Sequence, residues 1–387
     1  MRKNSDFKNI SYVNYEMISM IVTLLSCVFI SYSPIRIITR CGSASVIGIL
    51  FLCFIAYILY FFIIRGIFKN EYDFFDVIKQ TYPPLLQKFF GIVLYICLII
   101  YTYLVVSNLL YNLRASIYSK STIFAIAIFF IIAINMLAKR GFNVHFRIVG
   151  YISYFIVFYL IFIFIMSLQK MDLNNFLPIL GNGPVDVFGG NLFSLGIFAP
   201  LILFTFFGGN VANGKIRAVY KNYNITMFVF SACYTLLIFT FIATVPVELT
   251  EAKYTLLLDL SSLVSLSPLS LKLVPIMIFV FSLILFISSS FFVLSALYNI
   301  ERLNVVKDYS KFILPTVLIL VILFLIPLPL YIFNKLYNVM YIIAISVSFG
   351  FPIITLILYY IKTKGGRKKF ANGKNLEEYV EEVNWYE

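Results

Sequence analysis

The side chains that could do chemistry in this chain are polar groups placed inside long apolar stretches. Asn108 and Asn112 are four residues apart, so they share one face of a helix. Ser288, Ser289 and Ser290 stand in the middle of another apolar segment. Hydrocarbon cannot satisfy such groups, so they either bond between helices or face a cavity. Ser289 and Ser290 could ligate a small cation, or they could bond back to their own helix.

Groups suited to covalent or acid–base catalysis are scarce. The chain has a single histidine, His145, and no pair of carboxylates lies within an apolar stretch. The five cysteines are scattered and do not have the spacing of a zinc site or of a disulfide framework. This pattern argues against a Ser-His-Asp triad, a metal centre and a two-carboxylate hydrolase. We therefore expect a protein that is not an enzyme and that holds no metal and no cofactor.

The apolar stretches themselves indicate a polytopic membrane protein. Hydrophobic residues make up 61% of the chain and charged residues only 12%, and a transmembrane helix needs about 20 apolar residues. We expect an all-α fold with a cytoplasmic N-terminus (1–12), a ten-helix membrane domain (13–361) and a cytoplasmic tail (362–387). The ten predicted spans are residues 13–38, 43–65, 89–113, 120–138, 147–168, 191–207, 223–246, 271–299, 312–333 and 336–361.

Two of the ten stretches, the first and the sixth, are interrupted by small and helix-breaking residues. In the sixth, Pro200 has no N–H, which frees the carbonyl of Gly196 four residues earlier. In the first, Pro34 follows a run of small residues that begins at Ser26. First and sixth of ten are equivalent positions in a five-plus-five inverted repeat, in which secondary transporters bind substrates between broken helices. A simple proline kink is the alternative.

Open half-helix ends would suit a small zwitterion such as an amino acid. N-terminal ends can hold a carboxylate, and C-terminal ends can hold an ammonium group or a cation. Arg36, near the outer end of the first span, could anchor to headgroups or attract an anionic ligand. The candidate ligand-binding residues are Ser26, Cys27, Ser31, Ser33, Asn108, Asn112, Ser194 and Gly196.

The distribution of positive charge predicts the orientation. With the N-terminus in the cytoplasm, most of the 30 Lys and Arg residues fall on the cytoplasmic side, as the positive-inside rule requires. Both termini are then cytoplasmic. The net charge of +13 is therefore a consequence of this topology, and we expect no nucleic-acid partner. On the same side, Phe74, Phe75 and Ile78 share one face of a short predicted surface helix that ends before Pro83.

The stretch Asn175 to Gly183, with the sequence NFLPILGNG, resembles the endospore germination permeases. Pro34, Gly42 followed by Ser43, and Gly141 with Arg147 add to the likeness. These proteins are the membrane-embedded B-type subunits of nutrient germinant receptors. Their likeness to the amino acid, polyamine and organocation transporters implies a five-plus-five fold with a site between spans one, three, six and eight. It also implies A-type and C-type receptor subunits as partners in the spore inner membrane.

Two functions follow from these observations. In the first, the chain is a receptor subunit that binds a small nutrient and signals germination through its partners. In the second, it is an autonomous permease of the bacterial cytoplasmic membrane, with sodium coupling through the serines of span eight. Proton coupling is disfavoured because proton relays need titratable groups within the membrane.

Overall fold

The computed structural model describes residues 14–31, 33–68, 73–116, 122–207, 216–247, 270–325 and 330–371. Within these ranges the ordered elements are all helices. Seven are long and apolar enough to cross a membrane, and three shorter apolar helices accompany them. The predicted all-α membrane protein of about ten spans is thereby confirmed.

The first five spans comprise six α-helices and one short 3₁₀ turn. They are α1 (Asn14–Ser31) with α2 (Ser33–Cys41), η1 (Gly42–Ala44) with α3 (Ser45–Phe68), α5 (Pro84–Ser116), α6 (Ile123–Ala138) and α7 (Phe142–Ser167). A further helix, α4 (Phe74–Thr81), lies between the second and third spans, and the turns η2 (Leu168–Lys170) and η3 (Leu173–Phe176) follow the fifth.

The second five spans contain more irregular helix. They are η4 (Val185–Gly189), η5 (Gly190–Leu201) and α8 (Ile202–Phe207), then α9 (Ile216–Thr244), α11 (Ser270–Arg302), η9 (Tyr309–Phe312) with α12 (Ile313–Leu325), and finally α13 (Leu330–Ile345), η10 (Ser346–Gly350) and α14 (Phe351–Ala371).

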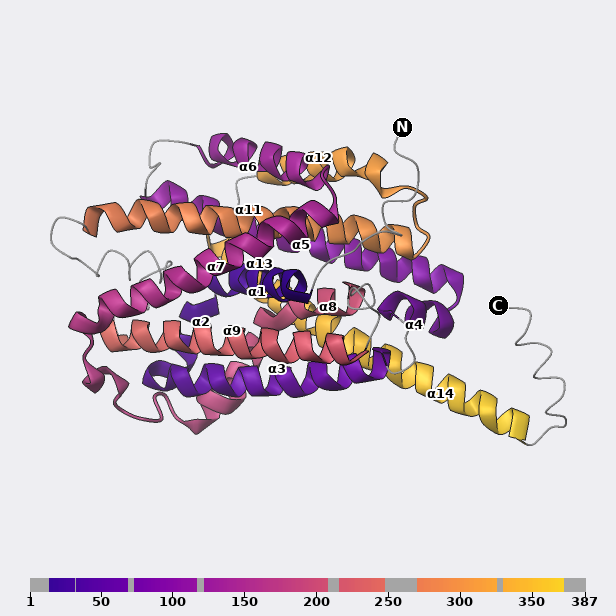
Figure 1. Ribbon diagram of the computed structural model, residues 1–387, viewed down its shortest axis with the longest axis horizontal. Coiled ribbons are helices and arrows are strands. Elements are labelled where there is room, and N and C mark those ends of the chain that lie inside the picture. Colours follow the sequence, from indigo (N-terminus) through magenta and orange to yellow (C-terminus); the bar gives the residue numbers. More distant parts are fainter. Residues whose placement is uncertain are drawn as a thin grey trace.

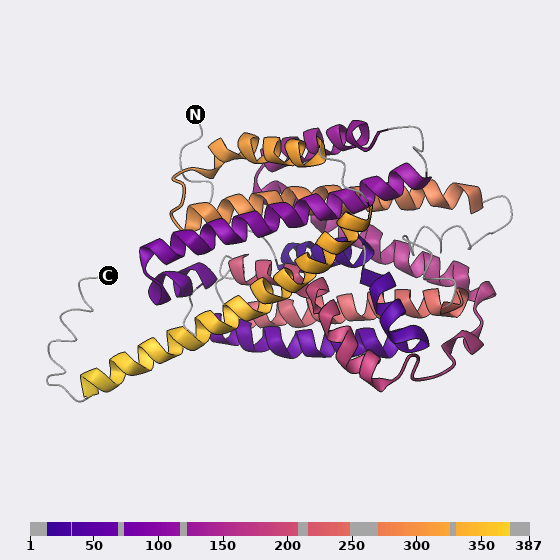
Figure 2. The same cartoon turned by 180° about the vertical axis from the view of Figure 1, so that it is seen from behind.

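Four pairs of spans that are five apart in the sequence pack against each other. The contacting pairs are α1 with η5, α3 with α9, α5 with α11, and α6 with α12. The last pair lies along one edge of the bundle and the α3 and α9 pair along the opposite edge (Figures 1 and 2). A two-fold relation between the halves would produce this pairing. Because each half has an odd number of spans, equivalent helices would then run in opposite directions, as in an inverted repeat.

Helix α1 lies at the centre of the bundle. It contacts α5, α7, α9, α11 and η5, and its side chains Leu24, Leu25 and Val28 are fully buried. A helix that is apolar on every side is expected to be surrounded by other helices in this way. Any cavity near the middle of the bundle is therefore close to α1.

The interruption of span one is shorter than the sequence suggested. Helix α1 runs without a break through Ser26 and Cys27, so the part of the prediction that placed the interruption there is wrong. The Ser26 hydroxyl donates to the Val22 carbonyl at 2.5 Å, which lets a serine remain inside a helix. The chain leaves α1 after Ser31, and Pro34 then occupies the first turn of α2, where its missing N–H costs nothing.

The interruption of span six is confirmed and is longer than expected. A π-helical turn, η4, leads into η5, which is 3₁₀ over 12 residues. Runs of 3₁₀ helix beyond three or four residues are uncommon and often mark a hinge or a strained segment. Pro200 lies inside η5, and it cannot supply the donor that an α-helix would need there.

Span ten carries an interruption that the sequence analysis missed. The π-helical turn η10 separates α13 from α14. Pro352 lacks an N–H, so the carbonyl of Ser348 loses its usual helical donor. The Tyr60 hydroxyl on α3 donates to that carbonyl at 3.0 Å. A side chain from span two thus satisfies the break in span ten.

The predicted short helix after span two exists, and its apolar face packs against the bundle while Gln80 on the other face is exposed. In α4, the side chains of Phe74, Phe75 and Ile78 are fully buried. They are buried because α4 packs against α8 and α14 in addition to α5. We call this side of the bundle the α4 end (Figure 1).

Candidate ligand-binding site

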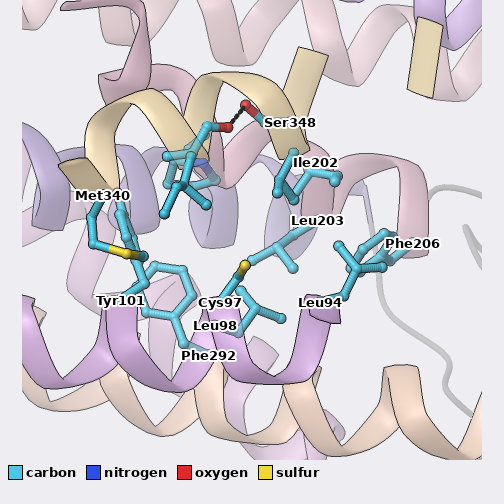
Figure 3. A pocket seen from close by; sticks show the side chains of 15 residues that line it. Leu94, Cys97, Leu98, Tyr101, Ile202, Leu203, Phe206, Phe292, Met340 and Ser348 are labelled. Carbon is cyan, nitrogen blue, oxygen red and sulfur yellow. Dashed lines mark hydrogen bonds between the residues drawn. The ribbon is translucent and has the colours of Figure 1, made fainter. Parts of the chain in front are cut away.

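A cavity with about 490 Å³ of empty space, which includes its opening to the outside, lies between α5, α11, α13 and span six (Figure 3). Its α5 residues lie about half-way along that helix. The lining residues are Leu94, Cys97, Leu98, Tyr101, Ala199, Pro200, Ile202, Leu203, Phe206, Phe292, Met340, Ile343, Ala344, Val347 and Ser348.

Two of the irregular helices border this cavity. Pro200 comes from the 3₁₀ segment η5, and Val347 and Ser348 come from the π-helical turn η10. Irregular backbone at membrane depth is tolerated where it is buried in protein or lines a cavity. The cavity therefore lies beside two broken helices, but the second of them is span ten and not span one.

The polar side chains on the cavity wall differ in whether their hydroxyl groups already have a hydrogen-bond partner. The Ser348 hydroxyl donates to the Ala344 carbonyl at 2.5 Å (Figure 3), so its proton is already used. The Tyr101 hydroxyl is buried and has no hydrogen-bond partner among the described residues. Its electrostatic neighbours are Cys27 of α1 and Tyr341 of α13. Leaving a buried hydroxyl unpaired is costly, so Tyr101 has the capacity to bind a polar group.

The predicted residues of α1 meet this cavity indirectly. Cys27 is fully buried and lies beside both Tyr101 and Ser288. Ser26 is also buried, and its hydroxyl is engaged within α1. The side chains of Ser31 and Ser33 lie outside the described residues, as does that of Asn112 on α5.

The predicted residues of span six are buried in the packing of η5. Ser194 is 1% exposed. At Gly196, a Cβ atom would lie 2.5 Å from Cδ1 of Tyr341, a distance that real Cβ atoms do not reach. Gly196 thus allows η5 to approach α13 closely. Its observed role is to bring together the two helices that border the cavity.

The predicted polar residues of α5 and α11 are buried as well. Asn108 is 6% exposed. Ser289 is fully buried, and its hydroxyl has no hydrogen-bond partner among the described residues. Ser290 lies 2.8 Å from Nε2 of His145 and 2.8 Å from the Ile287 carbonyl. The cavity wall includes none of the predicted residues that the structure describes.

His145 is a structural residue in this arrangement. It is fully buried, and Nδ1 lies 2.8 Å from the Gly141 carbonyl. A carbonyl can only accept, so Nδ1 carries the proton in the neutral ring. Nε2 is then an acceptor, and it shares the single proton of the Ser290 hydroxyl with the Ile287 carbonyl. The single histidine joins α7 to α11 and does not face the cavity.

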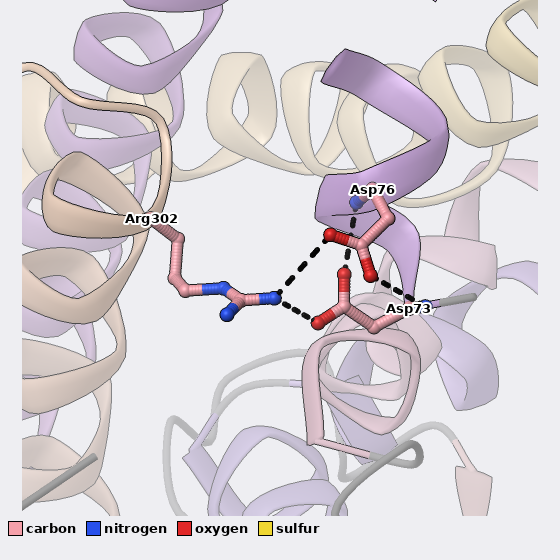
Figure 4. Close-up of polar contacts among 3 residues, drawn as sticks. All are labelled: Asp73, Asp76 and Arg302. Carbon is pink, nitrogen blue, oxygen red and sulfur yellow. Dashed lines mark hydrogen bonds and ion pairs between the residues drawn. The ribbon is translucent and has the colours of Figure 1, made fainter. Parts of the chain in front are cut away.

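Aromatic rings and an ion pair lie beyond Phe206 at the α4 end of the bundle. Phe206, which lines the cavity, lies 4.8 Å from the ring of Phe75 and 6.1 Å from that of Phe74, between centroids. Arg302 at the end of α11 contacts the carboxylate of Asp73, and its Nη2 lies 3.7 Å from Asp76 (Figure 4). Helix α4 is thereby held over this end of the bundle.

The loop after span five is hydrogen-bonded to α2, which is the second part of span one, and to the start of span two. The Ser43 hydroxyl donates to the Pro178 carbonyl at 2.5 Å. Asn182 Nδ2 donates to the carbonyls of Thr39 and Arg40 at 3.2 and 3.1 Å. These carbonyls belong to the last turn of α2, where the helix itself supplies no donors. The NFLPILGNG stretch thus caps the second part of the broken span.

Glycines permit this contact. Gly181 has φ +54°, and a Cβ there would lie 1.9 Å from the Cys41 carbonyl oxygen. Gly42 has φ +61°, and a Cβ would lie 2.8 Å from Asn182 Oδ1. Both positions need a residue that tolerates a left-handed conformation and a close approach.

Sequence reasoning missed most of the cavity wall because its residues are ordinary apolar side chains at helical spacing. Tyr101 is one of 28 tyrosines, so its type alone carried little information. Pro352 was a usable signal, since a proline inside a predicted span marks a freed carbonyl four residues earlier. Attention to it would have brought span ten into the predicted site.

A family model described as spore germination protein matches residues 12–331. The matched range begins just before α1 and ends at the start of α13, so it includes the broken spans one and six and the NFLPILGNG stretch. No curated protein matches the chain.

Proposed function

Because the chain belongs to the spore germination protein family, we propose that it is the membrane-embedded subunit of a nutrient germinant receptor. It binds a small nutrient, such as an amino acid, and signals germination. The family consists of membrane permeases and is not a class of enzymes, so we assign the chain a binding role and no catalytic role.

The observation that carries this proposal is the position of the cavity. It lies inside the bundle between two irregular helices, η5 and η10, and one of its wall residues, Tyr101, has a buried hydroxyl without a partner in the described part of the chain. Small-molecule sites are concave and mostly apolar, with a few polar groups that orient the ligand. Three of the predicted residues do not line the cavity and would support it indirectly, by holding α1 and η5 in place: Cys27, Ser194 and Gly196.

The packing at the α4 end supports a receptor that is reached from the other side. By the positive-inside rule we assign α4 to the cytoplasmic side, where Phe75 packs against Phe206 of the cavity wall and Arg302 contacts Asp73. On the opposite side, Arg36 of α2 lies over the Tyr341 ring at 4.9 Å, and its buried Nη1 has no hydrogen-bond partner within the ranges that the structure describes. We propose that Arg36 attracts the anionic group of a nutrient that enters from outside.

The remaining parts of the receptor follow from the family resemblance. We propose A-type and C-type subunits as partners, the spore inner membrane as the location, and cytoplasmic positions for both termini. Helix α4 suits transmission to these partners because it contacts Phe206 on the cavity wall and also lies at the cytoplasmic surface.

A second candidate is an autonomous sodium-coupled transporter of the same kind of solute. It is favoured by Ser289, whose buried hydroxyl has no partner among the described residues and could ligate a cation. In that case the contact between Asp73 and Arg302 would open during each transport cycle.

Gene deletion with paired assays separates the two functions. Spores that lack this gene should fail to germinate on one nutrient and germinate normally on others, and the purified protein in liposomes should not take up that nutrient. Complementation with the intact gene is the control. Normal germination together with sodium-dependent uptake would establish the transporter and overturn the receptor.

A further inference from the structure

We infer that the cavity takes a small ligand whose bulk is hydrocarbon, such as an amino acid with an aliphatic side chain, and that it rejects sugars and nucleosides. This inference rests on the proposed function and names the chemical class of its ligand. Its basis is the wall of the cavity, together with the small number of polar groups that remain available on it.

The wall is almost wholly hydrocarbon. It is formed mainly by side chains such as Leu98, Leu203, Phe206, Met340 and Ile343. Burial of apolar ligand surface against such side chains is favourable in proportion to the area removed from water. A ligand with a branched aliphatic chain would therefore be stabilised over most of its surface.

A ligand with many hydroxyls would not be stabilised there. The hydroxyl of Ser348 is engaged by the Ala344 carbonyl, and the carbonyl of Ser348 by Tyr60. Each ligand hydroxyl that exchanges water for this wall without gaining a partner loses roughly tenfold or more in affinity. A hexose carries several such groups, so the wall selects against it even where the volume would admit it.

The polar end of the ligand also has a defined position. Figure 3 shows Tyr101 at one end of the cavity, and Leu94 and Phe206 at the other. The hydroxyl of Tyr101 has no partner among the described residues, whereas the Phe206 end is apolar. The ligand's charged groups therefore lie toward Tyr101, on the side of Tyr341 and of the Arg36 guanidinium that lies over its ring, and its aliphatic chain points toward Phe206 and α4.

Competition binding to the purified full-length protein in lipid nanodiscs tests the chemical class of the ligand. Radiolabelled L-leucine and L-valine serve as probes, with L-aspartate, D-glucose and inosine as competitors. We expect saturable binding of an aliphatic amino acid that other aliphatic amino acids displace. L-aspartate, D-glucose and inosine should not displace it at a hundredfold excess.

Two variants test whether this cavity is the binding site. Ala344→Leu fills the cavity from α13 and should weaken leucine binding by at least tenfold, whereas Ala125→Leu, the same change at an exposed position of α6, should leave it unchanged. Tyr101→Phe removes only the unpaired hydroxyl. We expect about a tenfold loss of affinity with no loss of thermal stability, because that hydroxyl bonds to no described protein group.

The outcomes separate this inference from the proposed function. Specific binding of glucose or inosine, with germination still lost on gene deletion, would overturn the aliphatic ligand and keep the receptor. Equal leucine affinity in Ala344→Leu and Ala125→Leu would overturn the cavity as the binding place. If the deletion strain germinates normally on every nutrient, the receptor function itself is wrong.

Discussion

Arg302, the last residue of α11, contacts the carboxylate of Asp73 that caps the N-terminus of α4. The same carboxylate accepts from the backbone N–H of Asp76 at 2.9 Å, and Asp76 completes the capping box. The Arg302 guanidinium also lies over the rings of Phe75 and Tyr298, at 5.7 and 5.9 Å. Burial raises the pKa of Asp73, while Arg302 beside it acts in the opposite direction. One arginine thus joins span eight to α4.

Replacing Arg302 by Gln should loosen α4. The change leaves the neighbouring carboxylates of Asp73 and Asp76 without their cation, at a cost of about 1–3 kcal/mol for lost charge-assisted hydrogen bonds. We expect faster amide hydrogen exchange over residues 73–82. The matched control is Arg140→Gln, at an exposed arginine. Identical exchange in α4 for the two variants would show that Arg302 does not hold this helix.

Enlarging Gly196 should separate η5 from α13. A Cβ at Gly196 meets the Tyr341 ring at 2.5 Å, whereas a Cβ at Gly189 meets nothing within 4 Å. Overpacking of this kind costs about 1–3 kcal/mol. Gly196→Leu should therefore abolish the germination response while the protein still inserts into the membrane, and Gly189→Ala should respond as wild type. An unchanged dose response in Gly196→Leu would remove span six from the site.

The loop that caps α2 should be intolerant of a side chain at Gly181. Alanine there must adopt φ +54° and would also meet the Cys41 carbonyl, so we expect a loss of at least about 1–3 kcal/mol. Thermal unfolding in detergent, compared with Gly189→Ala, measures the difference. Asn182→Asp should act in the same direction, because a carboxylate cannot donate to the Thr39 and Arg40 carbonyls. Melting temperatures equal to that of the control would contradict a capping role.

Adjacent serines of α11 should behave differently. Ser290→Ala leaves Nε2 of the buried His145 without its partner and should cost about 1–3 kcal/mol. Ser289→Ala removes a hydroxyl that has no described partner and should not reduce stability. If Ser289 ligates a cation, its removal would instead abolish any effect of sodium on ligand binding. Thermal unfolding and binding with and without sodium separate these roles, and a larger stability loss in Ser289→Ala would reverse the assignment.

Much of the architecture could be predicted from local sequence. Ten apolar stretches predicted ten spans because hydrocarbon requires long, internally bonded helices. Pro200 and Gly196 predicted the irregular sixth span, since a missing donor and a missing Cβ act on the nearest turns. The small residues Ser26 and Cys27 predicted a break that does not exist, because a serine that donates to the Val22 carbonyl fits inside a helix.

The site could not be predicted to the same degree. Its wall consists of apolar residues from four spans, and such residues look alike wherever they face lipid, another helix or a cavity. The polar candidates on α11 drew attention because they are rare in a membrane span, yet Ser290 is satisfied by His145 from 145 residues away. A contact of that range has no local signature.

By itself, then, the sequence determined the class of protein, the number of spans and the breaks near Pro34 and Pro200. These properties depend on single residues and on their immediate neighbours along the chain. Only the tertiary structure decided that span ten borders the cavity, that the Tyr101 hydroxyl has no partner among the described residues, and that Arg302 ties α4 to the end of α11. Those facts depend on which distant helices meet, and packing between helices decides this once every span has already formed.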